Sequence, residues 1–143
     1  MKREELIALV EELTTPKYRV TSSHEFGEKL VKDIGHLSQE HYIVLVLDQQ
    51  HQILGQKTLN IGRINYSLVD LAELARTILS YPKAIGFITA HNHPGGSLEP
   101  SSADHEVRDQ VRGIAELFRF SYIDDLIISN KDYWSARENG FLE

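Results

Sequence analysis

The sequence contains no cysteine among its 143 residues. This absence excludes disulfides, thiol nucleophiles and every zinc site that is built on thiolates. Any bound metal would have to be held by His, Asp or Glu side chains. Such a ligand set suits a catalytic zinc that keeps an open position better than it suits a closed structural zinc.

Long hydrophobic runs are absent as well. No stretch approaches the roughly 20 apolar residues that a membrane span requires. The first residues, MKREELIALVEEL, carry charges in every helical turn, which is unlike a signal peptide. We therefore expect no membrane association, and without an export signal the cytoplasm is the expected location.

The chain has little positive charge, since 15 Lys and Arg oppose 21 Asp and Glu for a net charge of −6. A chain this acidic attracts phosphate backbones weakly over long distances, so charge alone argues against direct nucleic-acid binding. The mixed-sign segment EVRDQVR (106–112) is expected to form a solvated helix face. The composition, 41% hydrophobic and 25% charged, fits one globular domain with a substantial core.

The N-terminal part of the chain is expected to be helical. Residues 2–13 carry apolar side chains at helical spacing, and Pro16 breaks this pattern. Residues 1–20 are therefore expected to form a helical extension ahead of a domain at 21–143. A second helix is expected from about Ser23, which could cap it, to Ile34, with Gly35 as its C-terminal stop.

After residue 40 the predicted strands alternate with helices. Apolar and β-branched runs predict strands at 41–48, 53–66, 84–91 and 122–129, with an edge strand within 132–136. Helices are predicted at 67–79, opened by Ser67, and from about 102 to 118. This alternation predicts an α/β sandwich with a mixed sheet.

The segment AHNHPGGSLEPSSAD (90–104) carries the chemistry. Residues two apart on a strand share a face, so His91 and His93 are expected to project together at the end of the strand at 84–91. Two such imidazoles can chelate one Zn²⁺ at about 2.0–2.1 Å. Pro94 ends the strand because it cannot donate to the ladder, and the two glycines that follow allow a tight reversal.

Asp104 can return to the same point as a third ligand, which would leave a fourth position for water. Simpler interpretations exist for each part of this segment. HNHPGG is compatible with a polar surface turn, and Ser101-x-x-Asp104 is also a helix N-terminus signature. The two interpretations of Ser101 are compatible, because a capping serine can still offer its hydroxyl to a reacting oxygen.

A hydrolytic zinc site also needs a general base outside the ligand set. Three carboxylates are candidates: Glu40 at the start of a core strand, Glu99 in the loop and Glu106 on the following helix. A carboxylate at the mouth of a core strand is partly desolvated, which suits proton transfer. The residues alone do not choose among the three.

The arrangement of His91-x-His93, seven residues, and then Ser101-x-x-Asp104 resembles the JAMM signature of JAB/MPN metal-dependent proteases. Together with the flanking segments SQEHYIVLVLD, IDDLIIS and DYWSARENG, it resembles the RadC family of bacterial JAB domains over about residues 20–143. The resemblance implies an MPN-type α/β sandwich with a curled mixed sheet flanked by helices. It also implies Zn²⁺ bound by His91, His93 and Asp104, an oxyanion-stabilising Ser101 and Glu40 as the general base.

The function implied by this resemblance is a Zn²⁺-dependent hydrolase of peptide or isopeptide bonds, acting on an unidentified protein or peptide. The alternative is a metal-binding or interaction module without turnover, associated with DNA repair or mobile elements, which would allow nucleic-acid contact despite the charge. A metal-dependent nuclease or deaminase is disfavoured. Deaminases of related shape need cysteines, and nucleases usually use more carboxylates with Mg²⁺.

Overall fold

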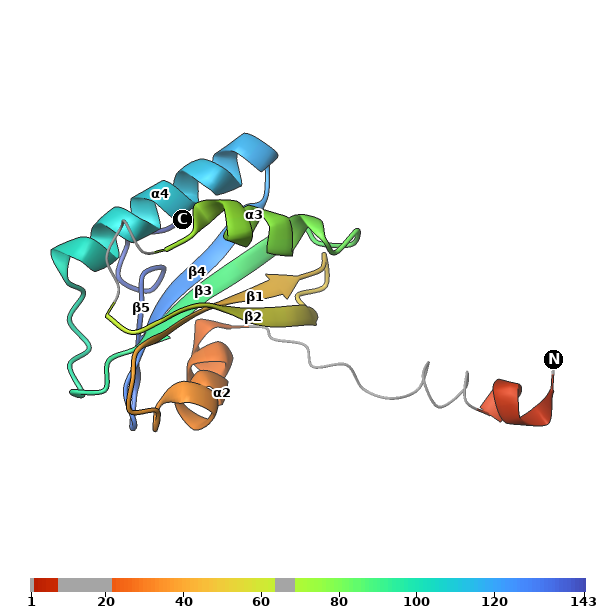
Figure 1. Cartoon of the computed structure of the whole chain (residues 1–143), viewed down its shortest axis with the longest axis horizontal. Helices are drawn as coiled ribbons and strands as arrows, with labels where there is room; N and C mark the ends of the chain where they lie inside the picture. The colour runs from red at the N-terminus through yellow and green to blue at the C-terminus, as the bar shows by residue number, and fades with distance from the viewer. Residues whose placement is uncertain (1, 8–21, 64–68) are drawn as a thin grey trace.

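A five-stranded sheet lies between helices on both of its faces in the computed structural model drawn in Figure 1. The structure describes residues 2–7, 22–63 and 69–143. The strand order is β2-β1-β3-β4-β5; only β3 and β4 pair in parallel, and the other neighbours are antiparallel. The predicted α/β class with a mixed sheet is confirmed. The strands are β1 (His41–Leu47), β2 (Ile53–Ile61), β3 (Gly86–Asn92), β4 (Ser121–Ile128) and β5 (Tyr133–Ser135).

Helices α3 (Leu71–Leu79) and α4 (Ser102–Phe118) cover one face of the sheet, and α2 (Ser23–Ile34) covers the other. The sequence of β1 accounts for this layering, because its side chains alternate between the faces. Tyr42, Val44 and Val46 pack in the core beneath α3 and α4. The intervening residues of β1 pack in the core above α2. Buried on both faces, β1 reads as the continuous apolar run that the sequence shows.

The ends of α2 differ in detail from the prediction. Ser22, and not Ser23, is the N-cap, since its hydroxyl accepts from the Glu25 N–H at 3.2 Å. Gly35 does end the helix, but its φ of −63° is open to any residue. Glycine is needed there because a Cβ atom would lie 2.4 Å from the carbonyl oxygen of Ser129. The prediction of a glycine stop was right, and its physical reason is a close backbone approach.

Other predicted elements are partly described. Residues 3–7 are helical, whereas the rest of the predicted helix at 2–13 lies outside the described residues, as does Ser67. Helix α3 begins at Leu71, with Asp70 as its N-cap. Strand β2 ends at Ile61, and residues 64–66 of the predicted strand lie outside the described residues. The predicted edge strand is β5. Within the described ranges, no helix combines the length and the apolar character that crossing a membrane requires.

The predicted solvated face at EVRDQVR (106–112) is wrong for three of its members. Val107, Arg108 and Val111 are buried against the sheet. The segment mixes charge signs, but its i, i+4 pair of valines faces the core. Arg108 lies between them on that same face and is only 2% exposed.

Two helical glycines offer a matched test of this packing. A Cβ atom at Gly27 on α2 would lie 2.3 Å from the ring of Tyr133, whereas nothing lies within 4 Å of one at Gly113 on α4. We expect Gly27→Ala to destabilise the fold by about 1–3 kcal/mol through overpacking. Gly113→Ala should stabilise it by about 0.5–1 kcal/mol because alanine is the better helix former. Urea unfolding measures both, and equal effects of one sign would contradict the placement of α2.

Candidate metal centre

Two imidazoles leave the carboxyl end of β3 on the face covered by α4. His91 is 2% exposed. His93 follows the last strand residue, and its backbone N–H donates to the Ile128 carbonyl at 2.8 Å, which keeps the chain extended. The Nε2 atoms of His91 and His93 lie 3.0 Å apart. The i, i+2 spacing thus places both rings together, as the strand pattern predicts.

The chain reverses directly after His93. The Gly96 N–H donates to the His93 carbonyl at 2.9 Å, and the φ of Gly96 is 87°, in the left-handed region that favours glycine. The loop then reaches Ser101, the N-cap of α4. This reversal brings the first turn of α4 back to the end of β3.

Asp104 joins the first turn of α4 to both imidazoles. Its Oδ2 accepts from the Ser101 N–H at 2.8 Å, while Ser101 Oγ accepts from the Asp104 N–H at 3.0 Å, which forms a capping box. Asp104 Oδ1 lies 3.1 Å from His91 Nε2, and Oδ2 lies 3.3 Å from His93 Nε2. The helix-start interpretation is confirmed, and the same carboxylate also faces both rings.

The three donor groups lie close enough together to share one ion. Ligand atoms about 2.0–2.1 Å from Zn²⁺ would lie about 3.3 Å from one another in a tetrahedral site. The two Nε2 atoms are 3.0 Å apart, and each faces a different oxygen of Asp104, at 3.1 Å for His91 and 3.3 Å for His93. His93 Nδ1 donates to the Ser97 carbonyl at 2.7 Å, so Nε2 carries the lone pair of the neutral ring. Among the described residues, this is the one group of three or more such side chains that converges. The residues fit a divalent metal ion.

The cluster favours an ionised Asp104. Burial alone would raise the pKa of Asp104, but hydrogen bonds and charge from the two imidazoles, with the Ser101 N–H, hold it well below its usual range. The hydrogen bond to Asp104 in turn raises the pKa of His93, against the opposing effect of burial. Asp104 is therefore a carboxylate at neutral pH, which is the form that binds metals.

A pocket of about 410 Å³ opens beside the cluster. Of the three carboxylates considered as bases, Glu40 and Glu99 line it, whereas Glu106 is exposed on α4 and does not. The polar side chains of its wall include Glu40, Arg63, His93, Glu99, Ser101 and Asp104.

Glu40 lies at the mouth of β1, as the sequence predicts. The strand β1 is antiparallel to β3, with Tyr42 opposite His91. Continued by two residues, this register sets Glu40 opposite His93. The charge of Glu40 contributes, after the larger effect of Asp104, to the raised pKa of His93. Glu40 therefore stands next to the cluster, outside its three donor groups.

Asn92 holds the segment that carries Glu40. Its side chain is fully buried on the face opposite the two histidines. Its Oδ1 accepts from the His41 N–H at 2.7 Å, and its Nδ2 donates to the Gln39 carbonyl at 3.0 Å. These two bonds flank Glu40 on either side and fix its backbone relative to β3.

Ser101 combines a helix cap with an accessible hydroxyl. Its side chain is exposed along the pocket wall, and its Oγ accepts from the Asp104 N–H. Because the capping bond uses the oxygen as an acceptor, the hydroxyl proton remains for a group bound in the pocket.

The sequence reasoning missed Asn92 and Arg63. Asn92 shares its strand face with Ile88 and Ala90 in the core above α2, so a buried polar residue among apolar neighbours was the available signal. Arg63 gave no such signal. It is exposed and follows the end of β2, and only the pairing of β2 with β1 brings it to the pocket.

Comparison with known proteins gives one matching family model and several relatives that share a name. Residues 20–141 match the sequence model of the RadC-like JAB domain. A UPF0758 protein from Streptococcus suis is 39% identical over 123 residues, which cover 84% of this chain and 48% of the relative. A UPF0758 protein from Streptococcus gordonii is 33% identical over 120 residues, with 84% and 53% covered.

A third relative, a UPF0758 protein from Streptococcus pyogenes serotype M49, is 37% identical over 126 residues, with 86% of this chain and 54% of the relative covered. The chain thus spans about half the length of the curated relatives it matches. The names of these relatives specify no activity.

The fit to a divalent ion leads to a direct test. We expect the purified protein to bind Zn²⁺, and His91→Ala to weaken that affinity by more than about 100-fold, because losing a ligand costs more than losing an outer partner. Competition with a chromophoric chelator measures both affinities. The exposed His36→Ala serves as the control and should bind like the wild type. Equal affinities for the wild type and His91→Ala would exclude a metal site here.

Proposed function

Because the chain belongs to the family of RadC-like JAB domains, we propose that it is a Zn²⁺-dependent hydrolase of peptide or isopeptide bonds. One observation carries this proposal. The donor atoms of His91, His93 and Asp104 converge beside a pocket whose wall also holds Glu40. A metal ligand set with an adjacent carboxylate outside it is the equipment that metal-assisted hydrolysis requires.

His91 Nε2, His93 Nε2 and a carboxylate oxygen of Asp104 would hold the ion. Three protein ligands leave a position for water, which distinguishes catalytic from structural zinc sites. When bound, Zn²⁺ acts as a Lewis acid that lowers the pKa of water from 15.7 toward about 7 and polarises a substrate carbonyl.

Glu40 is the proposed general base. Its carboxylate accepts a proton from water as the water oxygen attacks the carbonyl carbon. It then donates that proton to the leaving nitrogen as the C–N bond breaks. A positioned acid–base group contributes about 10²- to 10⁴-fold to the rate. The bonds of Asn92 to His41 and Gln39 support this role, because they fix the backbone on both sides of Glu40.

Ser101 is the proposed oxyanion donor. Its hydroxyl can donate a hydrogen bond to the substrate carbonyl oxygen as that oxygen gains negative charge. The capping bond from the Asp104 N–H holds Ser101 Oγ in place for this task. Removing one donor of this kind typically lowers the rate about 10²- to 10³-fold.

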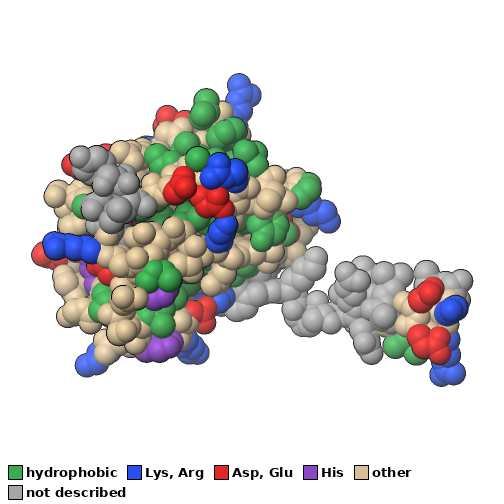
Figure 2. All heavy atoms as spheres, viewed as in Figure 1, with side chains coloured by type: hydrophobic (Ala, Val, Ile, Leu, Met, Phe, Trp, Pro, Cys, Tyr) green, Lys and Arg blue, Asp and Glu red, His purple; other side chains and the backbone are tan. Residues whose placement is uncertain are grey.

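The substrate is proposed to be a protein or peptide. Weak direct binding of nucleic acid, expected from the net charge of −6, stays a prediction. On the face drawn in Figure 2, Lys and Arg side chains are interspersed with Asp and Glu and form no single basic patch.

Substituting Glu40 separates an enzyme from a metal-binding module without turnover. We expect Glu40→Gln to lower kcat by about 10²- to 10⁴-fold and to leave Zn²⁺ affinity unchanged, because the amide cannot accept the proton. Turnover is measured on a panel of fluorogenic peptide and isopeptide substrates. Glu106→Gln, outside the pocket, is the control that should keep full activity.

Two results would contradict the assignment of the base. Loss of activity in Glu99→Gln, with Glu40→Gln still active, would move the role to the other carboxylate of the pocket. A panel on which the zinc-loaded wild type turns over no substrate would favour the non-catalytic module.

The role of Ser101 can be tested apart from its role as a cap. Glycine at an N-cap costs only a few tenths of a kcal/mol, so Ser101→Gly removes the hydroxyl with little effect on the helix. We expect its kcat to fall about 10²- to 10³-fold with unchanged Zn²⁺ affinity. Ser101→Thr, which keeps a hydroxyl, should retain most activity. Full activity in Ser101→Gly would remove the oxyanion role.

A further inference from the structure

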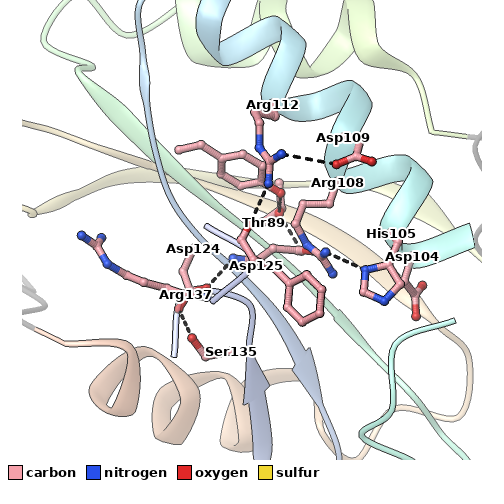
Figure 3. Close-up of polar contacts among 12 residues, drawn as sticks. Thr89, Asp104, His105, Arg108, Asp109, Arg112, Asp124, Asp125, Ser135 and Arg137 are labelled. Carbon is pink, nitrogen blue, oxygen red and sulfur yellow. Dashed lines mark hydrogen bonds and ion pairs between the residues drawn. The ribbon is translucent and has the colours of Figure 1, made fainter. Parts of the chain in front are cut away.

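A buried ion pair joins α4 to β4 next to the metal cluster. Arg108 on α4 and Asp125 on β4 are 2% and 3% exposed, and Arg108 Nε donates to Asp125 Oδ2 at 2.9 Å. The other oxygen, Asp125 Oδ1, accepts from the hydroxyl of Thr89 on β3 at 2.8 Å. Figure 3 shows the Arg108 side chain reaching from the helix to Asp125, with Thr89 beside it.

The partners of Asp125 sit on the two elements that carry the proposed ligands. Arg108 follows Asp104 by four residues, which is about one turn of α4 on the same face. Thr89 precedes His91 by two residues, so both side chains lie on the same face of β3. One carboxylate therefore ties the helix that carries Asp104 to the strand that carries the two imidazoles.

The network also reaches the cluster electrostatically. Burial raises the pKa of Asp125, and the charges of His91 and Arg108 oppose that rise. The ring of Tyr42 stacks on His91, with centroids 6.2 Å apart. The carboxylate of Asp125 is thus close enough to His91 for their charges to interact, besides being bonded to the elements that carry the proposed ligands.

Stability alone does not account for this pair. Moving two charges out of water is costly, and replacing a buried ion pair by well-packed apolar residues often leaves stability unchanged or raises it. In addition, Arg108 Nη2 is buried without a hydrogen-bond partner among the described residues, which adds to the cost of the pair. What the pair supplies that apolar side chains would not is direction, because its bonds fix α4 against β3 at one distance.

We propose that Asp125, with Arg108, is a positioning residue that holds Asp104 in register with His91 and His93. This inference rests on the proposed metal site. The pair sets the separation of the ligand-bearing elements, and therefore the affinity and the geometry with which the site binds a divalent ion. Neither side chain is a ligand itself.

The neighbouring Asp124 is a matched control. It is also fully buried on β4 but faces the opposite side of the sheet, where its carboxylate accepts from the hydroxyls of Ser23 and Ser135. It ties α2 and β5 to β4, and among the hydrogen bonds of the described residues it has none to α4. Asp124→Asn and Asp125→Asn therefore remove the same charge from adjacent positions. Only Asp125 is bonded to α4 and β3, which carry the proposed ligands.

The test uses Co²⁺ as the probe, with the full chain. We expect the apolar double variant Arg108→Met with Asp125→Leu to unfold at a temperature close to that of the wild type. Its Co²⁺ affinity should fall about 10- to 100-fold, the usual effect of losing an outer partner, with a changed visible absorption of the bound ion. Asp125→Asn, which keeps the side-chain shape, should show the same spectral change. Asp124→Asn should lower thermal stability and keep the wild-type Co²⁺ spectrum.

Several outcomes would overturn the proposal. Wild-type Co²⁺ affinity and spectrum in the Asp125 variants would make the pair a structural feature alone. So would an equal loss of affinity in Asp124→Asn, or failure of both Asp125 variants to fold. A wild-type protein that binds no Co²⁺ would remove the metal site and the proposed function as well, whereas wild-type binding with unaffected variants overturns this inference alone.

Discussion

The site depends on the carboxylate of Asp104, which accepts a hydrogen bond at the N-terminus of α4 and also faces two imidazoles. A helix N-terminus leaves backbone N–H groups without partners, and the capping box at Ser101 and Asp104 supplies acceptors for some of them. The same Asp104 oxygens face His91 and His93 from the end of β3. A helix that shifted by a residue would lose its cap and its contact with the imidazoles together. The cap of α4 and the proposed metal site thus require Asp104 at the same position.

The chemistry is divided between the two faces of β3. His91 and His93 point toward α4, and Asn92 between them points toward α2, where it binds the backbone on both sides of Glu40. Three consecutive residues therefore organise both the proposed metal cluster and the segment that carries the proposed base, Glu40. The sheet holds both in place, since β1 and β3 pair from Tyr42 and His91 to Leu47 and Gly86.

The sequence predicted what depends on local pattern. The α/β class, the range of α4 and the shared face of His91 and His93 follow from periodicity and motif spacing. Only the family resemblance singled out Glu40 from the three candidate carboxylates. Contacts between distant segments were out of reach. The carbonyl of Ser129 makes Gly35 necessary, although 94 residues separate them along the chain. Arg108 sits in a segment of mixed charge, and only its partner on β4 explains why it is buried.

Because the side chains of β3 alternate between the two faces of the sheet, the residues that line the pocket depend on the register of β3 against β1. A slip of one position against β1 would turn both imidazoles into the apolar layer above α2 and leave the amide of Asn92 facing α4. An extra residue between Gly86 and His91 would do the same, because it would move every following side chain of the strand to the other face. A chain that folds with β3 out of register would therefore lack the proposed metal cluster, so binding of a divalent ion would report whether β3 has paired correctly with β1.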